Sequence, residues 1–149
     1  MQKSSYQCVD NKIIIDCFYD REFNNQSLEI ISKYDKLIFS DYHIGINKKS
    51  KFKKLWEKNF DDNGKYKGVS GEMEQYDNIF NQKINNLPNI SSLIMSENFN
   101  QKINNLSQIN YLHLKYYFNK PIEYLPNSLN ILNIYDCAFN KKCNNLHTV

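Results

Sequence analysis

The chain repeats the eight residues Phe80-Asn81-Gln82-Lys83-Ile84-Asn85-Asn86-Leu87 without change at positions 99–106, which is 19 residues on. The motif returns in altered form as Phe118-Asn119-Lys120-Pro121-Ile122-Glu123-Tyr124-Leu125 and as Phe139-Asn140-Lys141-Lys142-Cys143-Asn144-Asn145-Leu146. A fixed period near twenty residues is typical of a solenoid, because one such repeat cannot bury its apolar face without its neighbours. The sequence therefore predicts a stacked repeat protein.

The apolar residues of each copy recur at the same offsets from its phenylalanine. They are Ile84, Leu87, Ile90, Leu93 and Met95 in the first copy and Ile103, Leu106, Ile109, Leu112 and Leu114 in the second. In the third copy the later positions shift by one residue, to Leu129, Leu132 and Ile134. This spacing fits the leucine-rich pattern L-x-x-L-x-L-x-x-N/C, with Asn98 or Cys137 in the last position.

The L-x-L core of the pattern has a period of two, which indicates a short strand with alternate side chains inward. The inward set is predicted to be Leu93, Met95, Leu112, Leu114, Leu132 and Ile134. Stacked repeats pair such strands in parallel, about 4.8 Å apart. The predicted fold class is an α/β-type, leucine-rich-repeat-like solenoid. Its short parallel strands lie on the concave face, and mostly loop and turn lie on the convex face.

Parallel stacking places each residue above its equivalent one repeat earlier. A stacked aromatic spine is predicted from Phe80, Phe99, Phe118 and Phe139. A ladder is predicted from Asn81, Asn100, Asn119 and Asn140, whose amides would satisfy buried backbone groups in the turns. We interpret both sets as structural, because buried polar groups nearly always serve to satisfy backbone.

The third copy combines Phe118-Asn119-Lys120-Pro121-Ile122 with Leu125-Pro126. This combination resembles the FNIP repeats, a branch of the leucine-rich-repeat superfamily, although Lys83, Lys102 or Lys142 replaces the motif proline in the other copies. The resemblance covers residues 80–146 and implies a curved interaction scaffold of the kind found in amoebae and giant DNA viruses. Some members of the family carry an F-box ahead of the repeats. The segment 28–31 is too short for one and lacks the leading Leu-Pro, so that function is not carried over.

We interpret residues 1–149 as a single domain. Residues 1–46 are predicted to form degenerate N-terminal repeats or a cap, because Leu37 and Phe39 follow Phe23 at the offsets of the third copy. Ile13-Ile14-Ile15 would add a strand, so that the sheet begins near residue 12. Residues 47–79 lose the register and are predicted to be an insertion against the sheet, with a short basic helix. Residues 80–149 carry the FNIP-like repeats.

The basic helix of the insertion is the alternative functional signal. Ser50 is placed to cap it, and Phe52, Leu55, Trp56 and Asn59 share one face. Its basic patch consists of Lys48, Lys49, Lys51, Lys53 and Lys54. Such a patch fits a nucleic-acid site, a nuclear-import signal or a solvated helix face. We favour the solvated face, since charge runs are commonly surface and a net charge of +3 does not favour a dedicated nucleic-acid binder.

The residues after this helix, Asn59-x-Asp61-x-Asn63-Gly64, resemble the start of a calcium-binding EF-hand loop. Ser70 stands where calcium requires a bidentate glutamate, so we expect no metal site. Asn63-Gly64 between Phe60 and Tyr66 instead favours a tight hairpin turn. No cofactor is expected either.

The start of the chain and its lack of long apolar runs lead us to expect an intracellular protein. The first six residues contain no apolar signal region and no run approaches a membrane span, so we expect a cytoplasmic protein, of an infected host in the viral case. Cysteines at positions 8, 17, 137 and 143 form no C-x-x-C pair. We expect them to be buried free thiols.

Catalysis has little basis in the sequence. His43, His113 and His147 lack metal-ligand spacing, and the chain has neither G-x-S-x-G nor a phosphate-binding glycine loop. The leading prediction is a non-enzymatic protein–protein interaction scaffold, whose partner the sequence does not identify.

The predicted partner-binding surface is formed by outward residues of the strands, because their inward neighbours are committed to the core. Three columns result: Ser92/Tyr111/Ile131, Ile94/His113/Asn133 and Ser96/Lys115/Tyr135. The large side chains Tyr111, Ile131 and Tyr135 are the expected anchors, since aromatic residues contribute much of the energy of interfaces. His113, Lys115 and Asn133 complete the predicted site.

Overall fold

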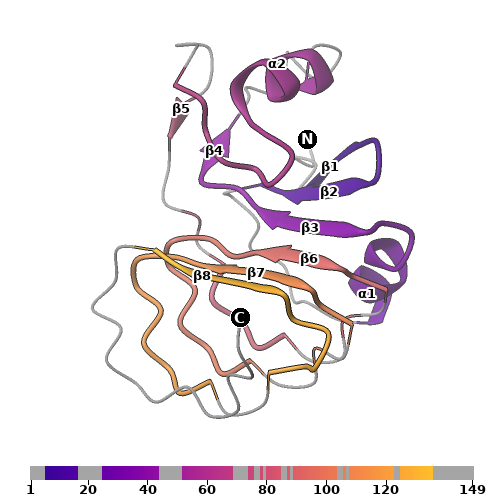
Figure 1. Ribbon diagram of the computed structural model, residues 1–149. Helices are drawn as coiled ribbons and strands as arrows, with labels where there is room; N and C mark the ends of the chain where they lie inside the picture. The colour runs from indigo at the N-terminus through magenta and orange to yellow at the C-terminus, as the bar shows by residue number, and fades with distance from the viewer. Residues whose placement is uncertain are drawn as a thin grey trace.

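The computed structural model describes residues 6–16, 25–43, 52–68, 74–75, 78, 80–84, 87, 89–103, 106, 108–122 and 125–135. Within them, six strands form one open sheet in the order β1-β2-β3-β6-β7-β8 (Figure 1). The strands are β1 (Tyr6–Val9), β2 (Lys12–Ile15), β3 (Lys36–Phe39), β6 (Ser92–Ile94), β7 (Tyr111–Leu114) and β8 (Ile131–Ile134). Neighbouring strands are parallel, except that β1 and β2 form an antiparallel hairpin.

Two helices and a second, smaller sheet complete the described structure. The helices are α1 (Asn25–Ile31) and α2 (Phe52–Asn59). The small sheet pairs β4 (Tyr42–His43) with β5 (Glu74–Gln75) in the antiparallel sense. A mostly parallel sheet with few helices is the architecture of an α/β fold.

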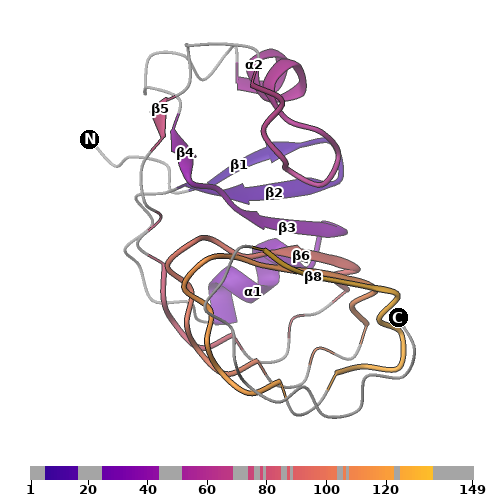
Figure 2. The ribbon, with the colours of Figure 1, turned by 60° about the vertical axis from the view of Figure 1, so that its left-hand side comes forward.

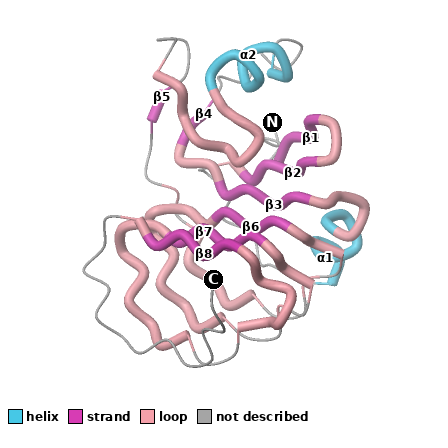
Figure 3. Tube along the Cα trace, in the orientation of Figure 1, coloured by secondary structure: helices cyan, strands magenta, loops and turns pink. Residues whose placement is uncertain are grey.

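Strand pairing joins residues that are equivalent in the sequence repeats. Leu93 of β6 lies opposite Leu112 of β7, which lies opposite Leu132 of β8. The described parts of the connections between these strands are loops and turns (Figure 3). The predicted strands and their parallel pairing are therefore confirmed.

One face of the sheet carries the main core. Leu93, Met95, Leu112 and Leu114 are buried there as predicted, together with Ile31 of α1. Leu132 and Ile134 are only half-buried. Their strand, β8, is the last in the described sheet, so it packs against a neighbouring strand on one side only.

The predicted aromatic spine is present on this core face. Phe80 and Phe99 stack with ring centroids 6.4 Å apart, and Phe99 and Phe118 stack at 6.1 Å. Phe39 extends the stack, with its ring 4.2 Å from that of Phe80. The fourth predicted member, Phe139, lies outside the described residues.

The asparagine ladder is also confirmed, although it is less buried than expected. The Asn81 side-chain oxygen accepts the backbone N–H of Asn100 at 2.8 Å, and the Asn100 oxygen accepts that of Asn119 at 2.9 Å. Asn81 is exposed, and the other two are half-buried. Asn140, the remaining predicted rung, lies outside the described residues.

The opposite face of the sheet is covered by the insertion, in a second apolar cluster. From α2 and the turn after it come Leu55, Trp56 and Phe60. They pack with sheet residues of β1, β2, β3 and β6, namely Val9, Ile14, Ile38 and Ile94. Figure 1 shows α2 beside β1 and β2, at the end of the sheet away from β8.

The prediction of three fully exposed columns is therefore wrong at their first members. Ser92, Ile94 and Ser96 are buried. The insertion packs on Ile94, and the Ser96 hydroxyl donates to the carbonyl oxygen of Phe80 at 3.4 Å. Among the described residues, exposed outward side chains remain at the β8 end of this face, at Ile131, Asn133 and Tyr135.

The N-terminal part departs from the sequence prediction in two ways. The sheet begins at β1, not near residue 12, because a turn at Asp10 with positive φ (53°) folds β1 back on β2. Helix α1 was not predicted, and it lies beside β3 and β6 in two views (Figures 1 and 2).

The cysteine prediction is wrong at Cys8, whose thiol is free as expected but exposed. Cys8 lies opposite Ile13 on the core face of the sheet, but β1 is the edge strand, and the main core does not extend far enough to bury this side chain. Cys17, Cys137 and Cys143 lie outside the described residues.

Candidate binding cleft

An open cleft of about 840 Å³ lies where the insertion stops covering the sheet. One wall is formed by outward residues of β7 and β8, and the other by the turn that follows α2. The lining includes Asp41, Tyr42, Asp61, Lys65, Tyr66, Glu97, Tyr111, His113, Lys115, Tyr116, Asn133 and Tyr135. Five of the six sequence-predicted binding residues thus line one cleft, and the sixth, Ile131, lies next to it on β8.

The sheet wall combines half-buried and exposed side chains. Tyr111 is half-buried against the second apolar cluster, and its hydroxyl oxygen accepts a hydrogen bond from the Asn133 amide at 3.0 Å. Ile131 is 48% exposed and Tyr135 is 67% exposed. Tyr116, which the sequence prediction missed, adds a third large side chain, 49% exposed, at the end of β7.

His113 of β7 belongs to the sheet wall of the cleft. Its ring contacts that of Tyr135 edge to face, with centroids 6.5 Å apart, and its buried Nε2 makes no hydrogen bond in the structure. Burial, together with the ammonium groups of Lys115 and Lys65, lowers the pKa of His113 from 6.5 to about 4. The imidazole is therefore neutral at physiological pH.

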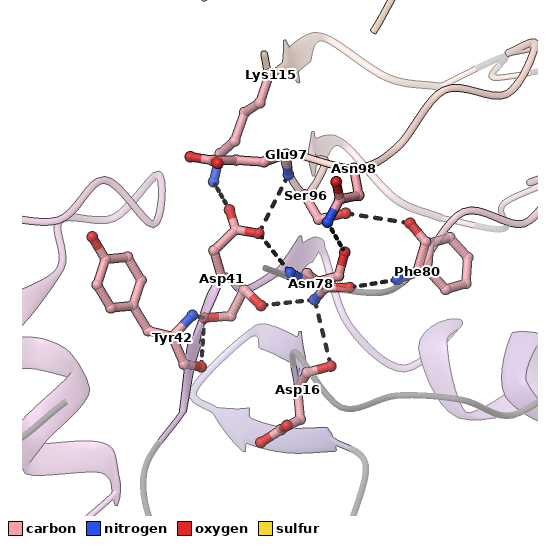
Figure 4. Close-up of polar contacts among 10 residues, drawn as sticks. Asp16, Asp41, Tyr42, Asn78, Phe80, Ser96, Glu97, Asn98 and Lys115 are labelled. Atoms are coloured by element: carbon pink, nitrogen blue, oxygen red, sulfur yellow. Dashed lines mark hydrogen bonds and ion pairs between the residues drawn. The ribbon is translucent and has the colours of Figure 1, made fainter. Parts of the chain in front are cut away.

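Lys115 is held by a buried carboxylate at the base of the cleft. Its Nζ lies 2.8 Å from Asp41 Oδ2 (Figure 4). The other oxygen of Asp41 accepts the backbone N–H groups of Asn78 and Glu97, each at 3.3 Å. Both oxygens of Asp41 are thus occupied, and the carboxylate fixes Lys115 in place.

Asn78 extends this network through its side chain. The amide donates to the Ser40 carbonyl oxygen at 2.7 Å, and its oxygen accepts the N–H of Phe80 at 2.9 Å. Asn98, the last position of the leucine-rich pattern, donates to the Asn78 carbonyl oxygen at 3.0 Å (Figure 4). The sequence prediction missed Asn78 and Asp41. Two signals were present. An asparagine stands shortly before the repeat phenylalanine in both copies, two residues before Phe80 and one residue before Phe99, and Ser40-Asp41 parallels Ser96-Glu97.

The opposite wall is the predicted tight hairpin turn, which is confirmed by the antiparallel bridge between Phe60 and Tyr66. Gly64 has φ of 75°, and a Cβ there would lie 3.2 Å from Ile38 side-chain atoms. Asp61 accepts the backbone N–H groups of Asn63 and Lys65, each at 2.9 Å. The Oδ1 atom of Asp61 thus stabilises the hairpin turn through two hydrogen bonds.

The described residues contain no group of three or more His, Cys, Asp or Glu side chains that would hold a metal ion. Ser70, His147 and the side chain of His43 lie outside what the structure describes.

The alternative basic patch is only partly described. Lys53 of α2 pairs with Asp10 at 2.8 Å and lies 3.8 Å from Glu57. Lys54 is exposed, while Lys48, Lys49 and Lys51 lie outside the described residues. The charge of Lys53 is thus matched within the protein.

We expect the free energy of unfolding to decrease as the pH is lowered, because His113 has a lower pKa in the folded chain than in the unfolded chain. The unfolded chain takes up a proton near pH 6.5 and the folded chain only near pH 4, so this contribution is complete above pH 6.5 and is lost on acidification between these values. Solvent screening of the half-buried ring limits the loss to about 1 to 2 kcal/mol. Urea melts at pH 7.5 and 4.5 measure it, and His113→Gln should show a smaller difference. If the wild-type protein and the His113→Gln variant lost the same amount of stability between pH 7.5 and 4.5, the assignment to His113 would be contradicted.

None of the helices in the described residues has the length and apolar character needed to cross a membrane. In comparisons with protein-family models, curated proteins and solved structures, the chain matches none.

Proposed function

We propose that the protein is a non-enzymatic interaction module that binds a protein partner in the cleft between β7–β8 and the turn after α2. The observation that carries the proposal is the set of exposed large side chains at this cleft, Tyr116, Ile131 and Tyr135. Aromatic side chains supply much of the energy of protein interfaces, and contiguous exposed apolar surface is uncommon without a partner. The rest of this sheet face is covered by the insertion.

We further propose that the sheet is the concave face of a leucine-rich-repeat-like solenoid of the FNIP type. Three features support this proposal. Equivalent residues pair in parallel from β6 to β8, one phenylalanine per repeat stacks in the core, and one asparagine per repeat bonds to the next. Each feature requires the near-twenty-residue period of the sequence.

The chemistry of the cleft supports binding over catalysis. Asp41 is saturated by two backbone N–H groups and Lys115, so it is not placed to act as a general base. His113 is neutral, but its Nε2 is buried. An exposed free thiol at Cys8 is compatible with a reducing, intracellular compartment, which we propose as the site of action.

The test is partner capture with a variant that removes two aromatic side chains from the cleft. Tyr116→Ser/Tyr135→Ser should retain the wild-type melting temperature, because both side chains are exposed, and should lose at least about 90% of the captured partner, since hot-spot truncations cost 2 kcal/mol or more. Pull-down with quantitative mass spectrometry measures this. Tyr6→Ser is the matched control, an exposed tyrosine at the other edge of the sheet.

Two outcomes would contradict the proposal. One is unchanged capture by the double variant. The other is loss of binding only in Lys53→Gln/Lys54→Gln, with a steep salt dependence, which would favour nucleic-acid binding through α2.

A further inference from the structure

Most of the charged groups that line the cleft are already matched within the protein. The Asp41 carboxylate is occupied by Lys115 and two backbone N–H groups, and Asp61 Oδ1 accepts two N–H groups of its own turn. Glu97 also makes a further interaction within the chain. Within the described part of the chain, the Lys65 ammonium is the one charged group of the lining without a hydrogen bond or ion pair.

These pairings favour a ligand without net charge. A basic group would find no unmatched carboxylate in the lining, and separating the buried pair of Asp41 and Lys115 would be costly. An acidic group would meet the Lys65 ammonium, but it would also face the carboxylates of Asp61 and Glu97. The cleft is therefore better suited to a neutral ligand than to a charged one.

Hydrogen-bond donors remain available in the lining, whereas several acceptors are in use. The Tyr111 hydroxyl oxygen accepts the Asn133 amide, which leaves the O–H proton of Tyr111 to donate. The exposed Tyr116 and Tyr135 add two hydroxyl groups, and the Lys65 ammonium adds three N–H donors. A ligand that supplies acceptors and carries few donors of its own suits this lining.

Tyrosine rings provide the apolar surface of the cleft. Tyr111, Tyr116 and Tyr135 lie on the side of the sheet, and on the opposite side Tyr66 stacks on Tyr42 with ring centroids 4.9 Å apart. The cleft lies over a face of the sheet, where strands present side chains and not backbone groups. A peptide in the cleft therefore cannot join the sheet as a further strand and must bind through these side chains.

We propose that the cleft binds a proline-rich segment of the protein partner in the polyproline II conformation. Proline rings are apolar and dock in grooves lined by aromatic side chains, and the preformed helix loses little entropy on binding. Proline has no N–H to be satisfied, while its carbonyl oxygens are free to accept hydrogen bonds from Lys65 and the tyrosine hydroxyl groups. This inference rests on the proposed function and specifies the chemistry of the partner.

The experiment compares peptides that differ only in their central residues. The probe is acetyl-Ser-Pro-Pro-Pro-Pro-Pro-Ser-amide. One counterpart has alanine in place of every proline, and two others carry glutamate or arginine in place of the central proline. NMR titration of the full chain, observing the backbone amides of Lys65, Asn133 and Tyr135, should give binding of the proline peptide about tenfold tighter than that of the alanine peptide. Maltohexaose, a neutral oligosaccharide, is titrated in parallel and should bind more weakly, because its hydroxyl groups are donors as well as acceptors.

A lysine variant then tests the role of the free donor. Lys65→Met removes the ammonium group and keeps most of the side-chain length, and the turn is retained because Lys65 contributes only backbone groups to it. The affinity for the proline peptide should fall about threefold to tenfold, as expected for loss of a charge-assisted hydrogen bond. Lys54→Met is the matched control, since Lys54 is an exposed lysine of α2 outside the lining, and it should leave the affinity unchanged.

An aromatic variant tests the apolar surface. Tyr116→Ser/Tyr135→Ser should remove most of the preference for proline over alanine, because both exposed rings of the sheet side are lost. Tyr6→Ser, at the other edge of the sheet, should leave the preference unchanged.

Five results would each overturn the inference. They are equal affinity for the proline and alanine peptides, tighter binding of the glutamate or arginine peptide, tighter binding of maltohexaose, no binding of the proline peptide, and equal effects of Lys65→Met and Lys54→Met. If the Tyr116→Ser/Tyr135→Ser variant still loses its captured partner in such a case, the proposed function stands and only the proline assignment fails. Unchanged capture by that variant would instead refute the proposed function itself.

Discussion

Phe99→Ala should cost about 3 to 5 kcal/mol of unfolding free energy, which is a large fraction of the stability of a domain of this size. Phe99 is the middle ring of a stack, 6.4 Å from Phe80 and 6.1 Å from Phe118, and it is almost fully buried. Removing it leaves a cavity between two rings that are held by their own repeats. The surrounding core therefore has little freedom to close the gap.

Urea denaturation followed by circular dichroism measures this loss. Phe99→Leu should cost less than half as much, because leucine fills part of the cavity. Tyr117→Ala is the matched control, since it removes a ring of similar size that is 54% exposed, and it should change stability by about 0.5 kcal/mol or less. A loss below about 1 kcal/mol for Phe99→Ala would show that the stack does not hold the repeats together.

Asp41→Ala should have the second large effect, about 3 to 5 kcal/mol, because it breaks a buried ion pair from one side only. The change leaves the Lys115 ammonium, whose side chain is only 21% exposed, without its partner. It also leaves two backbone N–H groups, of Asn78 and Glu97, without the acceptor that serves them.

A second ion pair in the same chain provides the control. Lys53 and Asp10 also lie 2.8 Å apart, but both side chains are more than half exposed. Asp10→Asn should therefore cause little or no change in the urea midpoint, since asparagine also tolerates the positive φ of this turn. Similar losses for Asp41→Ala and Asp10→Asn would contradict the role assigned to the buried pair. The double variant Asp41→Asn/Lys115→Met, which removes both charges, should recover part of the loss.

The parts of the fold that repeat were predictable from the sequence. Leu93, Met95, Leu112 and Leu114 are buried where the L-x-L period places them, and the stacked Phe and Asn residues follow from the repeated octet. Each copy of the repeat packs against equivalent residues of the neighbouring copies, so the same spacing recurs at each buried position. The spacing within one repeat is therefore enough to predict which residues are buried.

The parts that depend on non-repeated contacts were not predictable. Ile94 has the outward phase of its strand, and only the packing of α2 and the following turn buries it. No periodicity in residues 52–68 indicates which strands they will cover. Asp41 and Asn78 likewise act through partners that are distant in sequence, such as Lys115. The sequence therefore predicted the cleft residues of β7 and β8, but it did not predict the opposite wall.

Two identical octets create an ambiguity that the folding chain must resolve. Residues 80–87 and 99–106 have the same sequence, so a register slipped by one whole repeat would preserve most core contacts at that site. The column Ser96/Lys115/Tyr135 contains a single cation, and it is the one that reaches Asp41. In a chain slipped by one repeat, serine or tyrosine would stand opposite this buried carboxylate, and its charge would be left unmatched. We therefore expect the ion pair between residues 41 and 115 to favour the native alignment of the repeats over one slipped by a repeat, because only the native alignment places a cation opposite the buried carboxylate.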